Sequence, residues 1–239
     1  MKKGEILKIT IILSLAALVF YLFCGNPTKS RAQQLGPRFF ATWQAFSYAP
    51  SSFSGKVMPI SNSPIAVSFE LIDPATGKLI DVRNQTVYWY INDKFFKGGQ
   101  GIQSIFFRLP TRTSGIIDVR IQLPSFRNEL QLKTIKIPIV RPEAVIEAPY
   151  ADNKFQSTFV QLTGVPYFFN TKAPSALNFR WTVNGEAPPN AENPEVLGVN
   201  LNPDAPAGSS LNVSLTIQNP ANISETAIKN INLIFSPNK

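Results

Sequence analysis

The stretch Val87-Tyr88-Trp89-Tyr90-Ile91-Asn92-Asp93 decides the fold, because its pattern recurs 92 residues later as Phe179-Arg180-Trp181-Thr182-Val183-Asn184-Gly185. In both copies three apolar side chains alternate with three that can face water. This alternation predicts a β-strand whose tryptophan is buried. The Asn-Asp or Asn-Gly pair that follows is typical of a tight turn. We therefore predict that Trp89 and Trp181 are structural core residues of two similar β-structures.

The strands that follow each tryptophan recur at nearly the same spacing. Residues 117–123 alternate apolar and polar side chains, and residues 211–217 repeat that alternation 94 residues later. The last strands, 135–139 and 231–235, are 96 residues apart. A spacing near one hundred residues is the size of an immunoglobulin-like sandwich, and no sustained helical periodicity interrupts the pattern. We predict an all-β chain with two tandem immunoglobulin-like β-sandwich domains.

The predicted domains span residues 39–142 and 143–239, and a polar stalk at residues 26–38 precedes them. Residues 138–149 join the domains and contain three prolines and no glycine. Such a composition predicts a stiff linker that holds two domains end to end as a semi-rigid rod.

The first 25 residues are predicted to form an N-terminal transmembrane or signal helix. After a basic start, residues 9–24 are uncharged and mostly apolar, slightly short of the roughly 20 residues that span a bilayer core. One interpretation is a single-pass membrane anchor with the N-terminus inside and the domains extracytoplasmic. The other is a signal segment that is cleaved near Ala32, with secretion of the rest. We favour the anchor, because that cleavage site lies far beyond the apolar run.

The charge distribution argues against a nucleic-acid partner. The chain has a net charge of +8, of which residues 1–38 carry +5. Residues 39–142 carry +6, and residues 143–239 carry −3. Most of the basic excess is therefore a membrane-topology signal or lies next to the membrane, where anionic headgroups attract it. A protein that binds along the phosphate backbone of a nucleic acid would need clustered lysine and arginine side chains.

The composition also argues against catalysis. The chain has no histidine, and its only cysteine, Cys24, lies in the apolar segment. The commonest general base, the commonest zinc ligand and a thiol nucleophile are thus missing from the predicted domains. The acidic residues are scattered, and no calcium-loop motif is present. We expect no enzyme activity, no cofactor and no metal site.

Four aromatic residues are the candidate contact residues for a protein or glycan partner. Tyr88 and Tyr90 point opposite to Trp89, so they face outward on a sandwich and can form a binding stripe. Phe95 and Phe96 precede a glycine-rich segment that is predicted to be a flexible contact loop. The competing interpretation of the tyrosines is sheet stabilisation through cross-strand pairs. A separate change of phase in the apolar pattern predicts a β-bulge near Thr134.

The tryptophan strands, followed by Gly115-Ile116-Ile117-Asp118-Val119-Arg120-Ile121 and Gly208-Ser209-Ser210-Leu211-Asn212-Val213-Ser214-Leu215, resemble bacterial immunoglobulin-like and PKD-like domains. Those domains carry a tryptophan early and a glycine-initiated strand late. The turn pairs differ from the PKD-type Asp-Gly, since they are Asn92-Asp93 and Asn184-Gly185. The chain also looks like small membrane-anchored surface proteins of bacteria. The resemblance implies a spacer or adhesion module of the bacterial envelope rather than a catalyst.

Three functions stay open from the sequence. The first is a non-catalytic cell-surface or envelope protein that presents its domains for adhesion, spacing or assembly, for example as an accessory part of a pilus or envelope complex. The second is a carbohydrate-binding surface module that uses the aromatic residues named above. The third is an envelope enzyme with a carboxylate site, which composition alone does not exclude.

Overall fold

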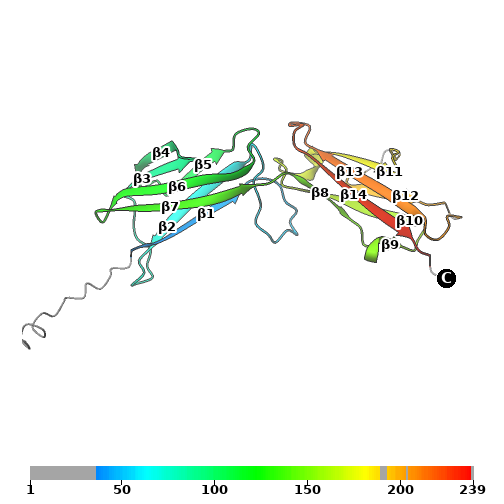
Figure 1. Ribbon diagram of the computed structural model, residues 1–239, viewed down its shortest axis with the longest axis horizontal. Coiled ribbons are helices and arrows are strands. Elements are labelled where there is room, and N and C mark those ends of the chain that lie inside the picture. The colour runs from blue at the N-terminus through cyan, green and yellow to red at the C-terminus, as the bar shows by residue number, and fades with distance from the viewer. Residues whose placement is uncertain (1–35, 189–192, 203, 238–239) are drawn as a thin grey trace, which may run out of the picture.

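The computed structural model describes residues 36–188, 193–202 and 204–237. Within these ranges the chain forms four sheets, which pack in two pairs around two separate hydrophobic cores (Figure 1). Among these residues, helix is limited to two short 3-10 turns, Ala151–Asn153 and Pro174–Ala176. The all-β prediction is confirmed for this part of the chain.

The N-terminal sandwich consists of a three-stranded and a four-stranded sheet, and every strand pair in them is antiparallel. The strand orders are β1-β2-β5 and β4-β3-β6-β7. The strands are β1 (Arg38–Ala45), β2 (Pro64–Ile72), β3 (Thr86–Ile91), β4 (Lys94–Gln100), β5 (Ser104–Arg108), β6 (Gly115–Phe126) and β7 (Glu129–Ile139). Such paired antiparallel sheets are the immunoglobulin-like architecture.

The C-terminal sandwich has the same arrangement of strands except for the fourth strand of its larger sheet. Its strand orders are β12-β10-β8 and β11-β13-β14-β9. The strands are β8 (Glu143–Glu147), β9 (Lys154–Phe155), β10 (Phe159–Tyr167), β11 (Asn178–Val183), β12 (Val196–Asn200), β13 (Ser210–Gln218) and β14 (Thr226–Phe235). The fourth strand of the larger sheet is β9, which runs parallel to β14, whereas the N-terminal sandwich has β4 beside β3.

The two tryptophans lie at equivalent core positions. Trp89 on β3 is 0% exposed and Trp181 on β11 is 6% exposed. Each indole Nε1 donates to a backbone carbonyl thirteen residues further along the chain, at Ile102 (2.9 Å) and Pro194 (3.0 Å). The shared bond shows that the sandwiches repeat local detail as well as strand order.

The asparagine after each tryptophan strand also has the same role in both sandwiches. Asn92 and Asn184 have left-handed backbones, with φ of 46° and 51°, a conformation that asparagine adopts more readily than most residues. Each Oδ1 accepts a hydrogen bond from a backbone N–H of the neighbouring strand in the sheet, at Asp118 on β6 (3.0 Å) and Asn212 on β13 (2.9 Å). This clamp fixes the turn against the neighbouring strand of the sheet.

Two local predictions are wrong. Residues 95–100 are not a loop, because they belong to edge strand β4. The bulge is not near Thr134, which pairs in register with Arg120; the register of β6 and β7 shifts between Leu123 and Phe126 instead. The change of phase on β7 has another cause, since Leu130 and Leu132 face solvent and are 54% and 51% exposed.

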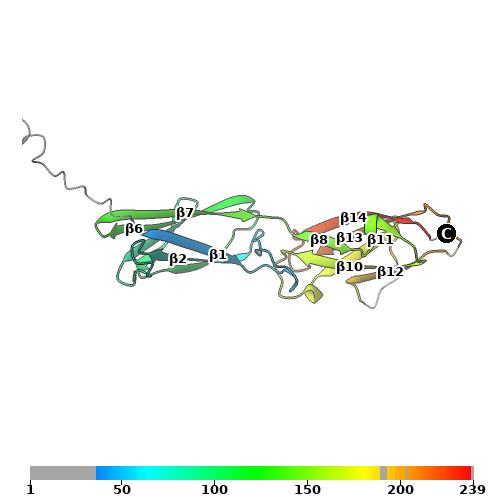
Figure 2. The same cartoon turned by 90° about the horizontal axis from the view of Figure 1, so that it is seen from below.

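The predicted linker is also mostly wrong. Strand β7 ends at Ile139 and β8 begins at Glu143, so only three residues separate the strands of the two sandwiches. Pro138 lies inside β7, which is an edge strand, the position in a sheet where proline is tolerated. The direct connection brings the two sandwiches close enough to touch end to end, as both views show (Figures 1 and 2).

The predicted N-terminal anchor or signal segment lies outside the described residues. Among the residues that the structure describes, no helix has the length and apolar character needed to cross a bilayer.

Candidate binding surfaces and the junction between the sandwiches

Three of the four predicted contact residues meet on the outer face of the β4-β3-β6-β7 sheet, and we call Tyr88, Tyr90 and Phe95 the aromatic patch. The Phe95 ring centroid lies 6.2 Å from that of Tyr88 and 5.8 Å from that of Tyr90, in edge-on arrangements. Phe95 is 61% exposed, while the tyrosines are half-buried. The rings thus stabilise one another and still present an apolar surface to solvent.

Phe96 does not join this patch. The register of β3 and β4 shifts between Trp89 and Tyr90, so that Phe96 is an extra residue without a partner on β3. Such a bulge redirects the side chain. The Phe96 ring lies 5.7 Å from the buried Phe107, at the rim of the core.

Arg120 borders the aromatic patch and gives it a charged edge. Its guanidinium carbon lies 4.6 Å from the centre of the Tyr90 ring, a cation–π contact. Its Nη1 donates to Asp93 at 2.7 Å. The ion pair leaves little net charge at this edge of the patch.

Gly98 is the residue that lets Tyr88 lie flat across strand β4. A Cβ at this position would lie 2.5 Å from Tyr88 Cδ1 and 3.2 Å from Phe95 Cε2. We expect Gly98→Val to displace both rings and to destabilise the N-terminal sandwich by about 1–3 kcal/mol, the range for overpacking. Near-ultraviolet circular dichroism and urea unfolding measure the two effects. Gly36→Ala is the control, because a Cβ there meets nothing within 4 Å, and equal stability of the two variants would contradict the prediction.

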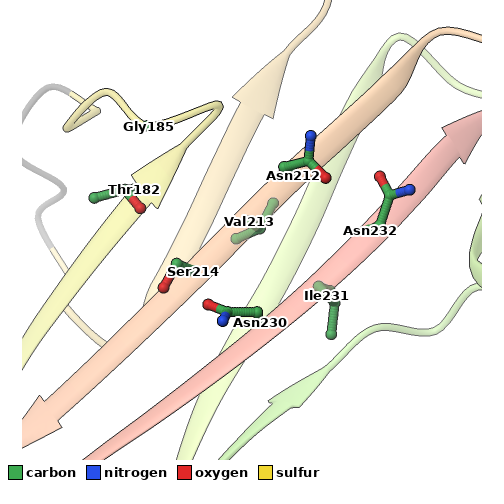
Figure 3. Close-up of a pocket in the computed structure, with 8 residues that line it drawn as sticks. All are labelled: Thr182, Gly185, Asn212, Val213, Ser214, Asn230, Ile231 and Asn232. Atoms are coloured by element: carbon green, nitrogen blue, oxygen red, sulfur yellow. The ribbon is translucent and has the colours of Figure 1, made fainter.

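The C-terminal sandwich carries a different surface at the equivalent place, which sequence reasoning missed. The outer face of β11, β13 and β14 has a shallow hollow of about 560 Å³. Five uncharged polar side chains surround it, and we call them the amide face (Figure 3): Thr182, Asn212, Ser214, Asn230 and Asn232. Asn212 lies opposite Asn232, and Ser214 lies opposite Asn230.

The N-terminal sandwich has charged residues where the C-terminal one has the amide face. Asp118 pairs with Lys136 across β6 and β7, as Asn212 pairs with Asn232 across β13 and β14. Lys136 Nζ lies 3.2 Å from the Asp118 carboxylate. One copy of the fold therefore has ion pairs and aromatic rings on this face, and the other has a hollow lined by uncharged amides and hydroxyls.

The direct contacts between the ends of the two sandwiches are a second feature that the sequence did not reveal. Segment 46–63, between β1 and β2, reaches the loop after β10. Tyr48 N–H donates to the Phe169 carbonyl (2.7 Å), and Phe168 N–H donates to the Tyr48 carbonyl (2.6 Å). The Phe53 ring packs edge-on against Tyr167 and Phe168, at centroid distances of 5.6 and 5.7 Å. Two backbone bonds and an aromatic cluster thus connect the sandwiches.

Phe168 has a strained backbone at this junction. Its φ is 62°, a left-handed conformation that is rare for a bulky residue and costs of order 1–3 kcal/mol. Such strain persists only where the surroundings fix it, and the bond to Tyr48 does so here.

Burial, then Glu195 and Tyr167, raise the pKa of the Tyr48 phenol above its ordinary value, so its neutral form is favoured at the junction.

A polar network extends the junction into the C-terminal core. Ser63 is 0% exposed and donates from Oγ to Asn170 Oδ1 at 2.7 Å. Asn170 Nδ2 donates to the Ser61 carbonyl (3.0 Å) and to Glu225 Oε1 (2.8 Å). A single asparagine side chain thereby bonds to both sandwiches.

Glu225 anchors this network. It is 4% exposed and accepts four N–H donors, two of which belong to Asn170: its backbone N–H (3.0 Å) and its Nδ2. The others are the Nδ2 groups of Asn219 (2.9 Å) and Asn222 (2.8 Å). Hydrogen bonding of this density compensates a buried carboxylate without a cation. The four donors hold Asn170 in the position that reaches the N-terminal sandwich.

Among the described residues no group of three or more acidic or sulfur ligands lies together. The described residues thus present two exposed faces, the aromatic patch and the amide face, and one junction between the sandwiches.

Comparisons with known proteins add similarity of fold only. No protein-family model matches the chain, and no curated protein sequence matches it. Fibronectin(III)-like modules of Clostridium thermocellum CbhA are similar at 12% identity over 83% of this chain and 94% of that one, with a TM-score of 0.29. Three N-terminal domains of the bacteriophage RB49 outer capsid protein Hoc are similar at 8% identity over 84% and 59%, with a TM-score of 0.40.

The Yersinia pseudotuberculosis adhesin InvE is a further similar structure, at 15% identity over 82% of this chain and 58% of that one, with a TM-score of 0.28. Similarity at this level says nothing about partners or activity.

Proposed function

We propose that the chain is a non-catalytic surface module whose two immunoglobulin-like sandwiches form one rigid unit that presents binding faces away from a membrane. The junction is the observation that carries the proposal. The backbone bonds of Tyr48, the Phe53 contacts and the Asn170 bonds all connect the sandwiches, and only three residues separate β7 from β8. Flexible linkage would need none of these contacts.

Membrane attachment is part of the proposal and rests on the sequence. The apolar run at residues 9–24, with basic residues before it, supports an anchor with its N-terminus inside. The absence of histidine and of cysteine after residue 24 supports a role without catalysis. We expect protease added to intact cells to digest the sandwiches; complete protection in sealed cells would refute the location.

Rigidity predicts a single narrow distribution of distances between the sandwiches. Spin labels at Lys97→Cys and Lys229→Cys, in a full chain that carries Cys24→Ser, would report it by double electron–electron resonance. Both lysines are exposed and lie on different sandwiches. We expect the same narrow peak at low and at high salt, because the junction contacts described above are hydrogen bonds and ring contacts rather than surface ion pairs. A broad distribution would contradict the proposed function.

A second candidate function is carbohydrate binding at the aromatic patch. The exposed Phe95 ring beside Tyr88 and Tyr90 favours it, because aromatic faces provide apolar contact area with polar groups close by. We expect Tyr88→Ala with Phe95→Ala to abolish binding to a glycan array. Phe96→Ala is the matched control, since Phe96 points away from the patch, and glycan binding that survives the double change would remove these residues from the site.

A further inference from the structure

We propose that the amide face of the C-terminal sandwich binds a neutral polysaccharide. The inference rests on the proposed function in that this sandwich is presented to such a polymer outside the cell. It assigns a ligand class to residues that are separate from the aromatic patch, which lies on the other sandwich.

The choice of residues on this face does not serve the sheet. Asparagine is depleted in β-strands, where valine, isoleucine, threonine and aromatic residues are preferred. Yet Asn212, Asn230 and Asn232 occupy outward positions in the middle of β13 and β14, in regular register. Residues that depart from local preference without backbone irregularity are expected where a sequence serves binding rather than folding.

The amide face has hydrogen-bonding capacity directed to solvent. The three asparagines are exposed, and Figure 3 shows their amides beside the hydroxyls of Thr182 and Ser214 on three neighbouring strands. Each amide has a carbonyl acceptor and two N–H donors, and each hydroxyl can donate or accept. The two rows, Asn212–Asn232 and Ser214–Asn230, are about 7 Å apart along the strands. A ligand therefore meets repeated donors and acceptors rather than one isolated group.

The lining of the hollow is uncharged, and the exposed Arg180, which faces outward on β11 two residues before Thr182, is not part of it. No charged side chain lines the hollow, whereas the equivalent face of the N-terminal sandwich carries Asp118, Arg120 and Lys136. An anionic polymer would find no cation in the hollow, and a protein partner would find no deep apolar pocket for an aromatic anchor. Sugar hydroxyls are neutral, and each both donates and accepts, which matches the amides.

Apolar side chains on β14 can add to the contacts with a sugar ligand. Ile228 and Ile234 lie on β14 at opposite ends of the asparagine pair and are 64% and 36% exposed. Their spacing from Asn230 and Asn232 places all four on the outward side of the strand. The C–H faces of sugar rings can pack on these side chains while their hydroxyls bond to the amides.

The test uses native affinity electrophoresis of the full chain in gels that contain one polysaccharide each. The neutral probes are β-glucan, xylan, mannan and dextran, and the acidic probes are alginate and polygalacturonate. We expect retardation by at least one neutral probe. Asn230→Thr with Asn232→Thr should lower the association constant about tenfold or more, through loss of two or more hydrogen bonds. The same variant should raise the urea midpoint, because threonine is preferred in strands.

Two further variants make the outcome decisive. Asn178→Thr changes an exposed asparagine on β11 outside the hollow, and it should leave retardation unchanged. Tyr88→Ala with Phe95→Ala should also leave it unchanged. Loss of binding with the aromatic variant alone would overturn this inference and support the second candidate function. Three other results would each overturn the inference about the amide face and leave the rigid-unit proposal intact. They are retardation by no neutral probe, retardation by acidic probes only, and a lower urea midpoint of the threonine variant.

Discussion

Glu225→Ala is expected to loosen the junction and to destabilise the C-terminal sandwich by about 3 kcal/mol or more. The change removes the acceptor of four N–H groups, and unpaired buried donors cost about 1–3 kcal/mol each when water cannot reach them. Three of those donors lie on Asn170 and Asn219, at 2.8–3.0 Å. Asn170 then loses the bonds that orient it toward Ser63. Urea unfolding measures the loss of stability, and spin-label distances should broaden in the same variant.

Two control variants distinguish loss of the hydrogen-bond network around Glu225 from loss of its negative charge. Glu225→Gln keeps one acceptor oxygen and places an amide N–H₂ against the remaining donors, so we expect an intermediate loss. Glu147→Ala removes an exposed carboxylate at the end of β8 in the same sandwich, and we expect a change within about 0.5 kcal/mol, as for other surface sites. An unchanged distance distribution in Glu225→Ala would show that the aromatic and backbone contacts hold the junction alone.

Trp89→Ala is expected to destabilise the N-terminal sandwich by about 3–5 kcal/mol, the range for removal of a buried tryptophan. The indole is 0% exposed, packs 5.7 Å from the Phe69 ring and donates to the Ile102 carbonyl. Because the two sandwiches have separate cores, the effect should remain local. Hydrogen–deuterium exchange should rise in β2, β3 and β6.

The matched variant is Trp181→Ala, which should raise exchange in β10, β11 and β13 instead. Trp89→Phe keeps most of the packing and loses the Nε1 bond, so it should cost less than the alanine variant. Equal protection of both sandwiches in Trp89→Ala would refute the independence of the two cores.

The tryptophan strands could be predicted because their side chains alternate between core and solvent. Strand β3 runs from Thr86 to Ile91 and β11 from Asn178 to Val183, within one residue of the prediction. Strand β8 was not predicted because it has only five residues and stands between prolines. A short segment flanked by prolines resembles a linker. Strand β4 was missed because nearly all of its residues are exposed, so that no alternation marks it.

The junction could not be predicted from local sequence. Asn170 and Glu225 are 55 residues apart, and each resembles an ordinary turn residue where it stands. Only the fold brings them together with Ser63, which lies 107 residues from Asn170. The amide face was missed for a related reason: its asparagines come from separate strands, and their neutrality is evident only beside the charged face of the other sandwich.

The antiparallel ladder between β1 and β2 determines how the molecule bears tension. Eight residue pairs, from Arg38–Ile72 to Ala45–Ile65, join these strands, and their hydrogen bonds lie perpendicular to the strand direction. A pull on Arg38 along β1, directed away from the junction, shears all these bonds together instead of unzipping them one after another. A surface module attached at that end would therefore resist extension by flow before its first strand detaches.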